Sequence, residues 1–223
     1  MSKQKIVVLT GAGMSAESGL KTFRDENGLW EGHDVMQVAS PQGFAQNPEL
    51  VLEFYNQRRR QLLDVSPNKG HLALAELEQG FDVSIVTQNV DNLHEKAGSS
   101  HVVHLHGELF KVRSTVNENH VLDWEKDLIL GDTDDHGHQL RPHIVWFGEM
   151  VPMLETAAQI TQQAEILIII GTSMQVYPAA SSEALLATTM LQKRTNINKV
   201  KMKGKKGLAL EPAVSFIILA IKV

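Results

Sequence analysis

Five short apolar runs recur along the chain and have the length and composition of buried β-strands. They are rich in Ile and Val, which favour strands. Their apolar residues are continuous rather than alternating, which is typical of a sheet covered on both faces. The runs are Ile6–Thr10, Val83–Thr87, Val102–Leu105, Ile144–Phe147 and Ile166–Ile170.

Segments whose apolar residues have helical spacing lie between several of these runs. In Pro48–Asp64 the apolar residues recur at steps of three or four, and Leu72–Leu77 and Met153–Ala164 are further helix candidates. Strands that alternate with helices predict an α/β fold with a parallel sheet.

Two segments break this rhythm. Lys111–Arg141 is polar and has no sustained period, so we interpret it as an inserted lobe or a long loop. The second segment contains seven Lys or Arg residues between Lys193 and Lys206, with no acid among them, and then an apolar end. We therefore expect one domain over residues 1–223, with an inserted small lobe at 111–141 and a divergent basic and apolar tail at 191–223.

Composition narrows the class of protein. The 223 residues contain 43 % hydrophobic and 21 % charged residues, which is ordinary for a globular protein. With Cys at 0 there is no disulfide, thiolate zinc site or cysteine nucleophile. The net charge of -5 argues against a nucleic-acid binder. No apolar run resembles a signal peptide or approaches the roughly 20 residues of a membrane helix, so we expect a cytoplasmic protein without a membrane partner.

A glycine-rich turn follows the first predicted strand. Gly11, Gly13 and Ala16 fit the G-x-G-x-x-G/A pattern of dinucleotide sites, at what we expect to be the start of a helix. The alternative is a tight strand-to-helix turn without a ligand. A dehydrogenase is disfavoured, because no strand precedes Glu31 or Asp34, the acids near the spacing that a ribose ligand requires.

Two further polar segments follow predicted strands. Gln88–Asp91 comes after Val83–Thr87, and Gly171–Ser173 comes after Ile166–Ile170. The carboxyl ends of parallel strands are where α/β folds bind ligands. The alternative for the first segment is a helix N-cap formed by Asn89 or Asp91.

His104 and His106 end the third predicted strand and would face the same side of it. A histidine at a strand end, followed by glycine and close to a cofactor site, is a candidate general base. A metal site is the weaker reading, since no further clear ligand accompanies the pair.

At this point the chain resembles a known family, the sirtuins, over about residues 4 to 182. Five blocks occur together in the sirtuin order: Gly11–Trp30, Gln88–Asp91, His106–Leu109, Val145–Glu149 and Gly171–Ser173. The resemblance implies a Rossmann-like parallel sheet with a smaller inserted lobe. It also implies an NAD-consuming enzyme that removes acyl groups from lysines of proteins or peptides and releases nicotinamide and O-acyl-ADP-ribose.

The resemblance assigns roles to individual residues. His106 would be the general base that activates a ribose hydroxyl. Three blocks would bind NAD: Gly11, Ala12, Gly13, Ser15, Glu17, Ser18, Phe23, Arg24 and Trp30; Gln88, Asn89, Val90 and Asp91; and Gly171, Thr172 and Ser173. The substrate peptide would lie along an extended strand edge at Val145, Trp146, Phe147, Gly148 and Glu149.

Tyr55 and Arg58 point to the bacterial sirtuins grouped with the desuccinylases. They lie one helical turn apart, so a phenol and a guanidinium would share a face and grip the carboxylate of a succinyl or malonyl group. Spacing alone favours the alternative, in which Arg58 belongs to a solvated face with Arg59 and Arg60.

The chain departs from the family pattern in two places. Most sirtuins hold a zinc ion with four cysteines in the small lobe, whereas Ser114 stands where the first is expected, and His120, His136 and His138 are a poor substitute cage. We therefore predict no zinc. The last Rossmann strand, with its Asn-containing adenine-side motif, is not recognisable after about Ala187.

Four activities remain open at this stage. The leading one is removal of succinyl or malonyl groups, and also acetyl groups, from lysine. The alternatives are a plain lysine deacetylase, a non-catalytic module that binds NAD or ADP-ribose, and a mono-ADP-ribosyltransferase.

Overall fold

The computed structural model describes residues 3–20, 29–30, 32–172 and 220–221. Its centre is a sheet with the strand order β10-β9-β1-β4-β5. The strands are β1 (Lys5–Thr10), β4 (Asp82–Thr87), β5 (Val102–His104), β9 (Ile166–Ile170) and the short β10 (Ala220–Ile221). The pairs β1–β4, β1–β9 and β4–β5 are parallel, and β10 is antiparallel to β9. The predicted parallel α/β sheet is confirmed.

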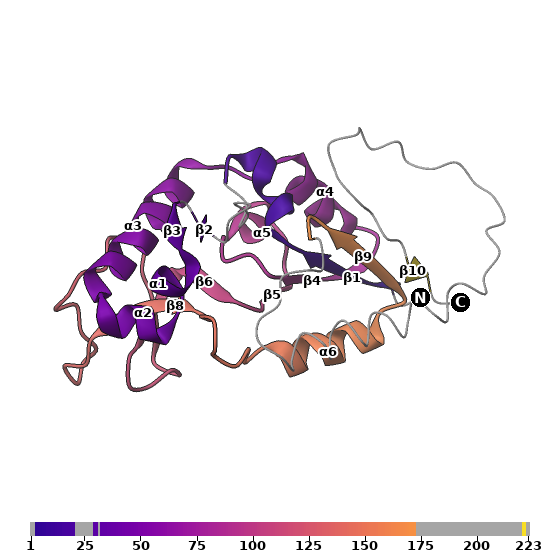
Figure 1. Ribbon diagram of the computed structural model, residues 1–223. Helices are drawn as coiled ribbons and strands as arrows, with labels where there is room; N and C mark the ends of the chain where they lie inside the picture. The colour runs from indigo at the N-terminus through magenta and orange to yellow at the C-terminus, as the bar shows by residue number, and fades with distance from the viewer. Residues whose placement is uncertain (1–2, 21–28, 31, 173–219, 222–223) are drawn as a thin grey trace.

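Helices cover both faces of this sheet (Figure 1). Alternate residues of β1 point to opposite faces. Val7 and Leu9 pack in the cluster with α6 (Leu154–Gln163), whereas Ile6 and Val8 pack in the cluster with α4 (Lys69–Leu77). Burial on both faces explains the continuous apolar runs. Among the described residues, no helix is long and apolar enough to cross a bilayer.

A second group of elements lies beside the sheet, at the left in Figure 1. It contains the helices α1 (Val35–Val38), α2 (Pro41–Gln46) and α3 (Pro48–Asp64) and the short hairpin of β2 (Leu29–Trp30) and β3 (His33–Asp34). The predicted boundaries of α3 are confirmed. Pro48 occupies the first turn, where no N–H is needed, and the Asn47 side chain caps the helix by accepting from Leu50 N–H.

The inserted lobe is a small antiparallel sheet rather than a long loop. Its strand order is β7-β6-β8, with β6 (Gly107–Ser114), β7 (Val121–Asp123) and β8 (Leu140–Ile144). The lobe is therefore wider than the predicted 111–141. The predicted strand at Ile144–Phe147 is wrong, because only Ile144 belongs to a strand, the end of β8. The rest of the segment is a loop, from which Trp146 is buried in the α3 cluster and Phe147 packs against it, while Val145 packs against the cluster of β1 and α6.

The Asp134 carboxylate organises the part of the small lobe that contains His136 and His138. Asp134 is buried and accepts from the backbone N–H groups of His136 and His138, each at 2.9 Å. The Ser114 hydroxyl also bonds to it, and these hydrogen bonds outweigh burial, so the pKa of Asp134 lies below its ordinary value. No group of three metal-ligating side chains occurs within the described ranges, and the expected absence of zinc stays a prediction.

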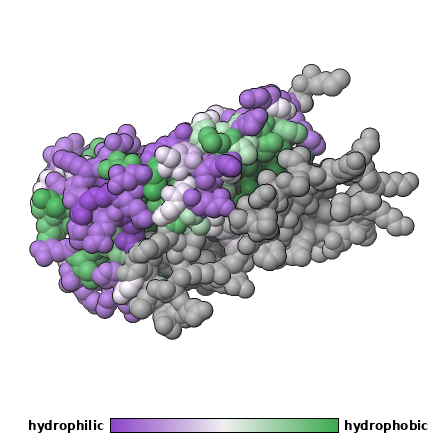
Figure 2. Space-filling model, turned by 90° about the horizontal axis from the view of Figure 1, so that it is seen from above, coloured by the Kyte–Doolittle hydropathy of each residue, from purple (hydrophilic) through white to green (hydrophobic). Residues whose placement is uncertain are grey.

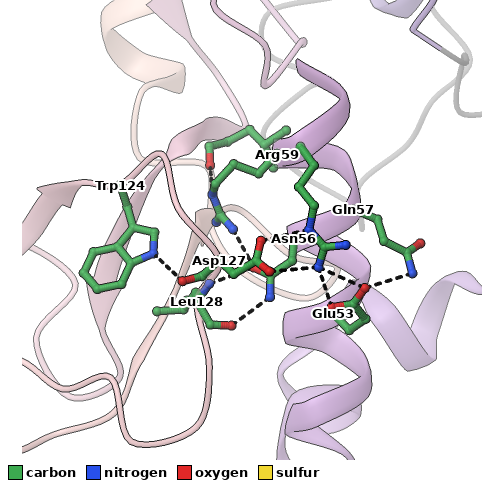
Figure 3. Close-up of polar contacts among 9 residues, drawn as sticks. Glu53, Asn56, Gln57, Arg59, Trp124, Asp127 and Leu128 are labelled. Carbon is green, nitrogen blue, oxygen red and sulfur yellow. Dashed lines mark hydrogen bonds and ion pairs between the residues drawn. The ribbon is translucent and has the colours of Figure 1, made fainter. Parts of the chain in front are cut away.

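Polar side chains of α3 clamp the loop that follows β7 (Figure 3). The Asn56 amide donates to the Leu128 carbonyl at 3.0 Å and accepts from the Leu128 N–H at 2.8 Å. The buried Arg59 guanidinium donates to Asn56 Oδ1 at 2.7 Å and to the Leu109 carbonyl at 3.1 Å. Burial lowers the pKa of Arg59 to about 10. The small lobe is thus fixed to α3 by hydrogen bonds.

Replacing Asn56 with Ala is expected to destabilise the protein by about 2–4 kcal/mol, because buried partners on Leu128 and Arg59 lose their hydrogen bonds. For a domain of this size, that loss lowers the Tm by about 4–16 °C. The control is Gln57→Ala, which removes an exposed amide from the next position of the same helix. Equal Tm values for the two variants in a thermal melt would contradict the clamp.

The surface seen in Figure 2 is mixed in polarity. Hydrophilic residues dominate the end of the molecule that carries α3, interrupted by single hydrophobic residues. Isolated exposed apolar side chains are normal for a globular protein and indicate no function.

Candidate active site

Three strand ends bring the predicted motifs together. β9 and β4 flank β1, and Thr10 at its end is in register with Ile170 on one side and Thr87 on the other. The segments 11–18, 88–91 and 171–172 therefore meet at one edge of the sheet. The chain first extends the sheet on the β4 side of β1 and later returns on the β9 side. This is a topological switch point, where open α/β sheets bind ligands.

The glycines of the first motif allow two loops to touch. Gly13 N–H donates to the Gly171 carbonyl at 2.8 Å. A Cβ on Gly11 would lie 2.7 Å from Thr172 Cβ, and a Cβ on Gly13 would lie 2.9 Å from Gly171 Cα. Gly171 itself has a φ of +67°, which favours glycine. Close packing between the two loops therefore accounts for glycine at these positions.

Within residues 11–20, the described part of this segment, no α-helix follows the glycine turn, so the expectation of a helix start there is wrong. Two 3₁₀ turns, Ala12–Met14 and Ala16–Ser18, occupy the segment. The second ends at Gly19, whose left-handed φ of +94° is typical of a residue that terminates a helical turn. Ser15, which joins the two turns, is buried and faces the 88–91 segment.

Ser15, Asn89 and Asp91 form a buried polar cluster. The Ser15 hydroxyl donates to Asp91 Oδ2 at 2.9 Å and accepts from Asn89 Nδ2 at 3.0 Å. Burial raises the pKa of the Asp91 carboxyl, against the lowering effect of its hydrogen bonds from Leu93 N–H and Ser15. One oxygen of Asp91 accepts from the N–H of Leu93, the first residue of α5 (Leu93–Lys96), but the N-cap of α5 is Asn92 and no side chain caps the helix, so the N-cap alternative is wrong. The other oxygen faces the glycine turn.

A second buried cluster lies beneath the first and was missed by sequence reasoning. The Thr10 hydroxyl donates to Thr87 Oγ1 at 2.8 Å and lies 3.0 Å from His94 Nε2. Thr87 Oγ1 also accepts from Asn89 N–H at 3.0 Å. Burial lowers the pKa of His94 to about 3, so its ring is neutral. Polar residues at the ends of two apolar strands were the available signal.

His106 lies in the bend between β5 and β6, beside the 88–91 segment. Its Nδ1 donates to the Gln88 carbonyl at 3.0 Å. A carbonyl can only accept, so Nδ1 carries the proton of the neutral ring and the basic lone pair is on Nε2. Gln88 is fixed in turn, because its N–H donates to Thr10 O at 2.9 Å and its side-chain oxygen accepts from Thr172 Oγ1 at 3.1 Å. The ends of β1, β4 and β9 thus together fix Gln88, whose carbonyl binds His106.

Tyr55 and Arg58 are close neighbours on α3, and the proposed solvated arginine face does not exist. Arg59 is fully buried, Arg58 is half-buried and only Arg60 is exposed. The Arg58 guanidinium lies 3.2 Å from the centroid of the Phe54 ring, and its Nη1 donates to Phe54 O at 2.6 Å. Tyr55 is buried, which raises the pKa of its hydroxyl.

The segment Val145–Glu149 is not the expected extended strand edge: it belongs to no strand and contains a turn in which Glu149 N–H donates to the Trp146 carbonyl at 3.0 Å. Val145 N–H donates to His106 O and Phe147 N–H donates to Ala39 O, both at 2.9 Å. Trp146 is buried, and its indole N–H donates to the Tyr55 hydroxyl at 3.0 Å. The turn therefore lies between the histidine and the α3 pair. A role of its residues in binding substrate stays a prediction.

Glu149 has a structural task in this turn. It accepts from Arg141 at 2.6 Å, from Arg113 at 3.1 Å and from Trp146 N–H at 2.8 Å. The two arginines and the N–H outweigh burial, so the pKa of Glu149 lies below its ordinary value. Its carboxylate holds the turn against the small lobe.

The remaining predicted site residues are placed as follows. Ala12 and Ser18 are half-buried and Glu17 is exposed on the two 3₁₀ turns, while the Val90 carbonyl accepts from Leu109 N–H. Gly148, beside Glu149, is exposed and has a φ of +89°. Phe23, Arg24 and Ser173, together with the Trp30 side chain and most of the 191–223 tail, lie outside the described residues.

Comparison with known proteins agrees with the resemblance to the sirtuins. Residues 11–178 match the model of the Sir2 family, the sirtuins. A protein of Helicobacter pylori named NAD-dependent protein deacylase is 65 % identical over 178 residues, which cover 80 % of this chain and 78 % of that protein.

Solved structures of Sir2 proteins are also similar to this chain. The structure of a Sir2 homologue in complex with NAD is 42 % identical with a TM-score of 0.72, covering 83 % of this chain and 75 % of that one. A Sir2 complex with 2′-O-acetyl-ADP-ribose and a deacetylated p53 peptide is 30 % identical with a TM-score of 0.65, covering 84 % of this chain and 78 % of that one.

Proposed function

Because the chain belongs to the Sir2 family, we propose that it is an NAD-dependent protein deacylase, which removes acyl groups from lysine side chains. The reaction consumes NAD and one water molecule and yields the free lysine, nicotinamide and O-acyl-ADP-ribose. Proteins or peptides that carry acyl-lysine are its substrates.

The observation that carries this proposal is the setting of His106. Its Nδ1 is committed to the Gln88 carbonyl, so the basic Nε2 is the nitrogen that can take a proton. Gln88 is held by Thr10 and Thr172, which belong to the ends of β1 and β9. A base with a fixed tautomer, at the switch point of the sheet, suits proton removal from a bound ribose.

The residues present fit NAD as the co-substrate. Three loops meet at the carboxyl edge of the sheet, and polar side chains of Ser15, Asn89 and Asp91 converge there. When bound, NAD supplies an electrophilic ribose carbon and a nicotinamide leaving group. In our proposal Asn89 and Asp91 line the nicotinamide pocket, the 11–18 turn binds phosphate and ribose, and Nε2 of His106 accepts the proton of a ribose hydroxyl.

We further propose that dicarboxylic acyl groups, succinyl and malonyl, are preferred. Arg58 offers a guanidinium that is half-buried and stacked on Phe54, which suits pairing with the carboxylate of a dicarboxylic acyl group. A plain deacetylase is the second candidate. It is favoured by the hydrogen bond that the Tyr55 hydroxyl already accepts from Trp146.

The test is nicotinamide release from NAD with acetyl-, succinyl- and malonyl-lysine forms of one peptide. We expect release with all three acyl peptides, a higher kcat/KM for the two acids, and none with unmodified peptide. A higher kcat/KM for the acetyl form would favour the plain deacetylase. NAD binding without release on any peptide would favour the non-catalytic module.

A further inference from the structure

Two histidines at the end of β5 contact two consecutive carbonyls of the 88–91 segment. His106 Nδ1 donates to Gln88 O at 3.0 Å, and His104 Nδ1 donates to Asn89 O at 2.9 Å. His106 is the proposed base. His104 is buried and has no part in the function described above.

The second ring nitrogen of His104 is also committed. Nε2 lies 2.8 Å from Glu95 Oε1 on α5, and the His104 side chain is 7 % exposed. A backbone carbonyl and a carboxylate oxygen both only accept hydrogen bonds. A neutral imidazole has only one N–H, so the lone pair of its other nitrogen would point at an oxygen that can only accept. Only the doubly protonated ring satisfies both partners.

The Asn89 carbonyl belongs to the residue that connects the polar cluster. Asn89 Nδ2 donates to Ser15 Oγ, and the Ser15 hydroxyl donates to Asp91. A displacement of the Asn89 backbone therefore moves an amide and a carboxyl of the site together. His104 and Glu95 tie this backbone to β5 and to α5.

We propose that His104 is a positioning residue for the deacylation reaction: its imidazolium, held by Glu95, fixes the Asn89 carbonyl and keeps Asn89 and Asp91 in the geometry that the nicotinamide half of NAD requires. This inference rests on the proposed function. His104 acts through Asn89 and is not a catalytic residue.

The charges around the ring favour the imidazolium. Burial would lower the pKa of His104, but the hydrogen bond and charge of Glu95 outweigh it, and the pKa is raised. The other titratable groups facing the ring are Glu108 from β6, Asp91 from the loop, and the neutral His94 from α5. Because the pKa is raised in the folded protein, the contact is complete below that pKa and is lost as the pH rises through it.

The role of His104 is tested by comparing the full chain with Glu95→Gln, His104→Ala and the control His101→Ala. His101 lies at the other end of β5, is exposed and contacts Ser84 at 2.8 Å. The kcat and KM for NAD are measured with one acyl-lysine peptide as a function of pH. The affinities for NAD and ADP-ribose are measured by calorimetry over the same pH values.

We expect His104→Ala to raise the KM for NAD about tenfold or more, the effect of losing a hydrogen bond from a charged donor. Affinity for ADP-ribose, which lacks nicotinamide, is expected to change far less. Glu95→Gln keeps an acceptor but removes the charge, so the loss of NAD binding with rising pH is expected to begin at a lower pH than in the wild type. His101→Ala is expected to match the wild type.

Two results would overturn the proposal. One is a Glu95→Gln profile that coincides with the wild-type profile. The other is a His104→Ala variant that either retains its KM for NAD or loses NAD and ADP-ribose affinity equally, as a merely structural role predicts. Absence of wild-type turnover on every acyl peptide would instead reject the proposed function, and the pH profile of NAD binding would still decide the role of His104.

Discussion

Replacing His106 with Asn or Ala is expected to lower kcat/KM for deacylation by about 10²- to 10⁴-fold, the usual contribution of a general base. The reason is the fixed tautomer, in which the Gln88 carbonyl holds Nδ1–H and leaves Nε2 as the basic nitrogen. An Asn amide can still donate to that carbonyl but offers no basic nitrogen. NAD affinity should therefore be largely retained, most of all in His106→Asn.

The measurement is kcat/KM on one acyl-lysine peptide together with the Kd for NAD. Wild-type turnover in His106→Asn would show that His106 only supports the loop. A parallel loss of NAD binding and turnover in both variants would assign it to cofactor binding instead.

Arg58→Met is expected to lower kcat/KM for a succinyl-lysine peptide by about 30- to 5,000-fold, which corresponds to 2–5 kcal/mol for an unpaired buried charge. The guanidinium lies on the Phe54 ring, and Met preserves much of that apolar contact. Removal of acetyl, which carries no carboxylate, should be nearly unaffected.

Arg60→Met is the matched control, because Arg60 lies on the same helix but is exposed and paired with Glu53 and Asp127. Equal losses on the succinyl and acetyl peptides in Arg58→Met would place Arg58 in fold or cofactor support. No loss on either peptide would exclude it from acyl selection.

Local sequence pattern predicted the sheet and the long helices well. Continuous Ile and Val runs gave four of the central strands, and three-to-four spacing gave Pro48–Asp64. These patterns are reliable because burial on both faces of a sheet, or on one face of a helix, acts directly on the residues concerned. The prediction of a strand at Ile144–Phe147 failed, since Val145, Trp146 and Phe147 pack against the core from a loop and not from a strand.

Pairings between distant residues were not predictable in the same way. The clamp between Asn56 and Leu128 spans 72 residues, and the contact between Ser15 and Asp91 spans 76. The sequence around each of these residues does not indicate which distant residue it contacts. Glu149 illustrates the point, because its position in a motif suggested substrate binding, whereas the structure surrounds it with Arg113 and Arg141.

The gathering of the candidate motifs at one edge of the sheet was predicted, but the contacts that support them were not. Motifs that follow parallel strands must gather at one edge, which is why the glycine turn, Gln88–Asp91 and Thr172 meet. The buried threonine pair and His94 beneath them could not be inferred, because polar residues at a strand end have many possible partners.

The most direct test of the central claim is mass spectrometry of the products formed from NAD and a succinyl-lysine peptide. We predict equal amounts of nicotinamide, free-lysine peptide and O-succinyl-ADP-ribose, and no products when NAD is omitted. Transfer of ADP-ribose to the peptide with the acyl group retained, or loss of the acyl group without NAD, would contradict the account.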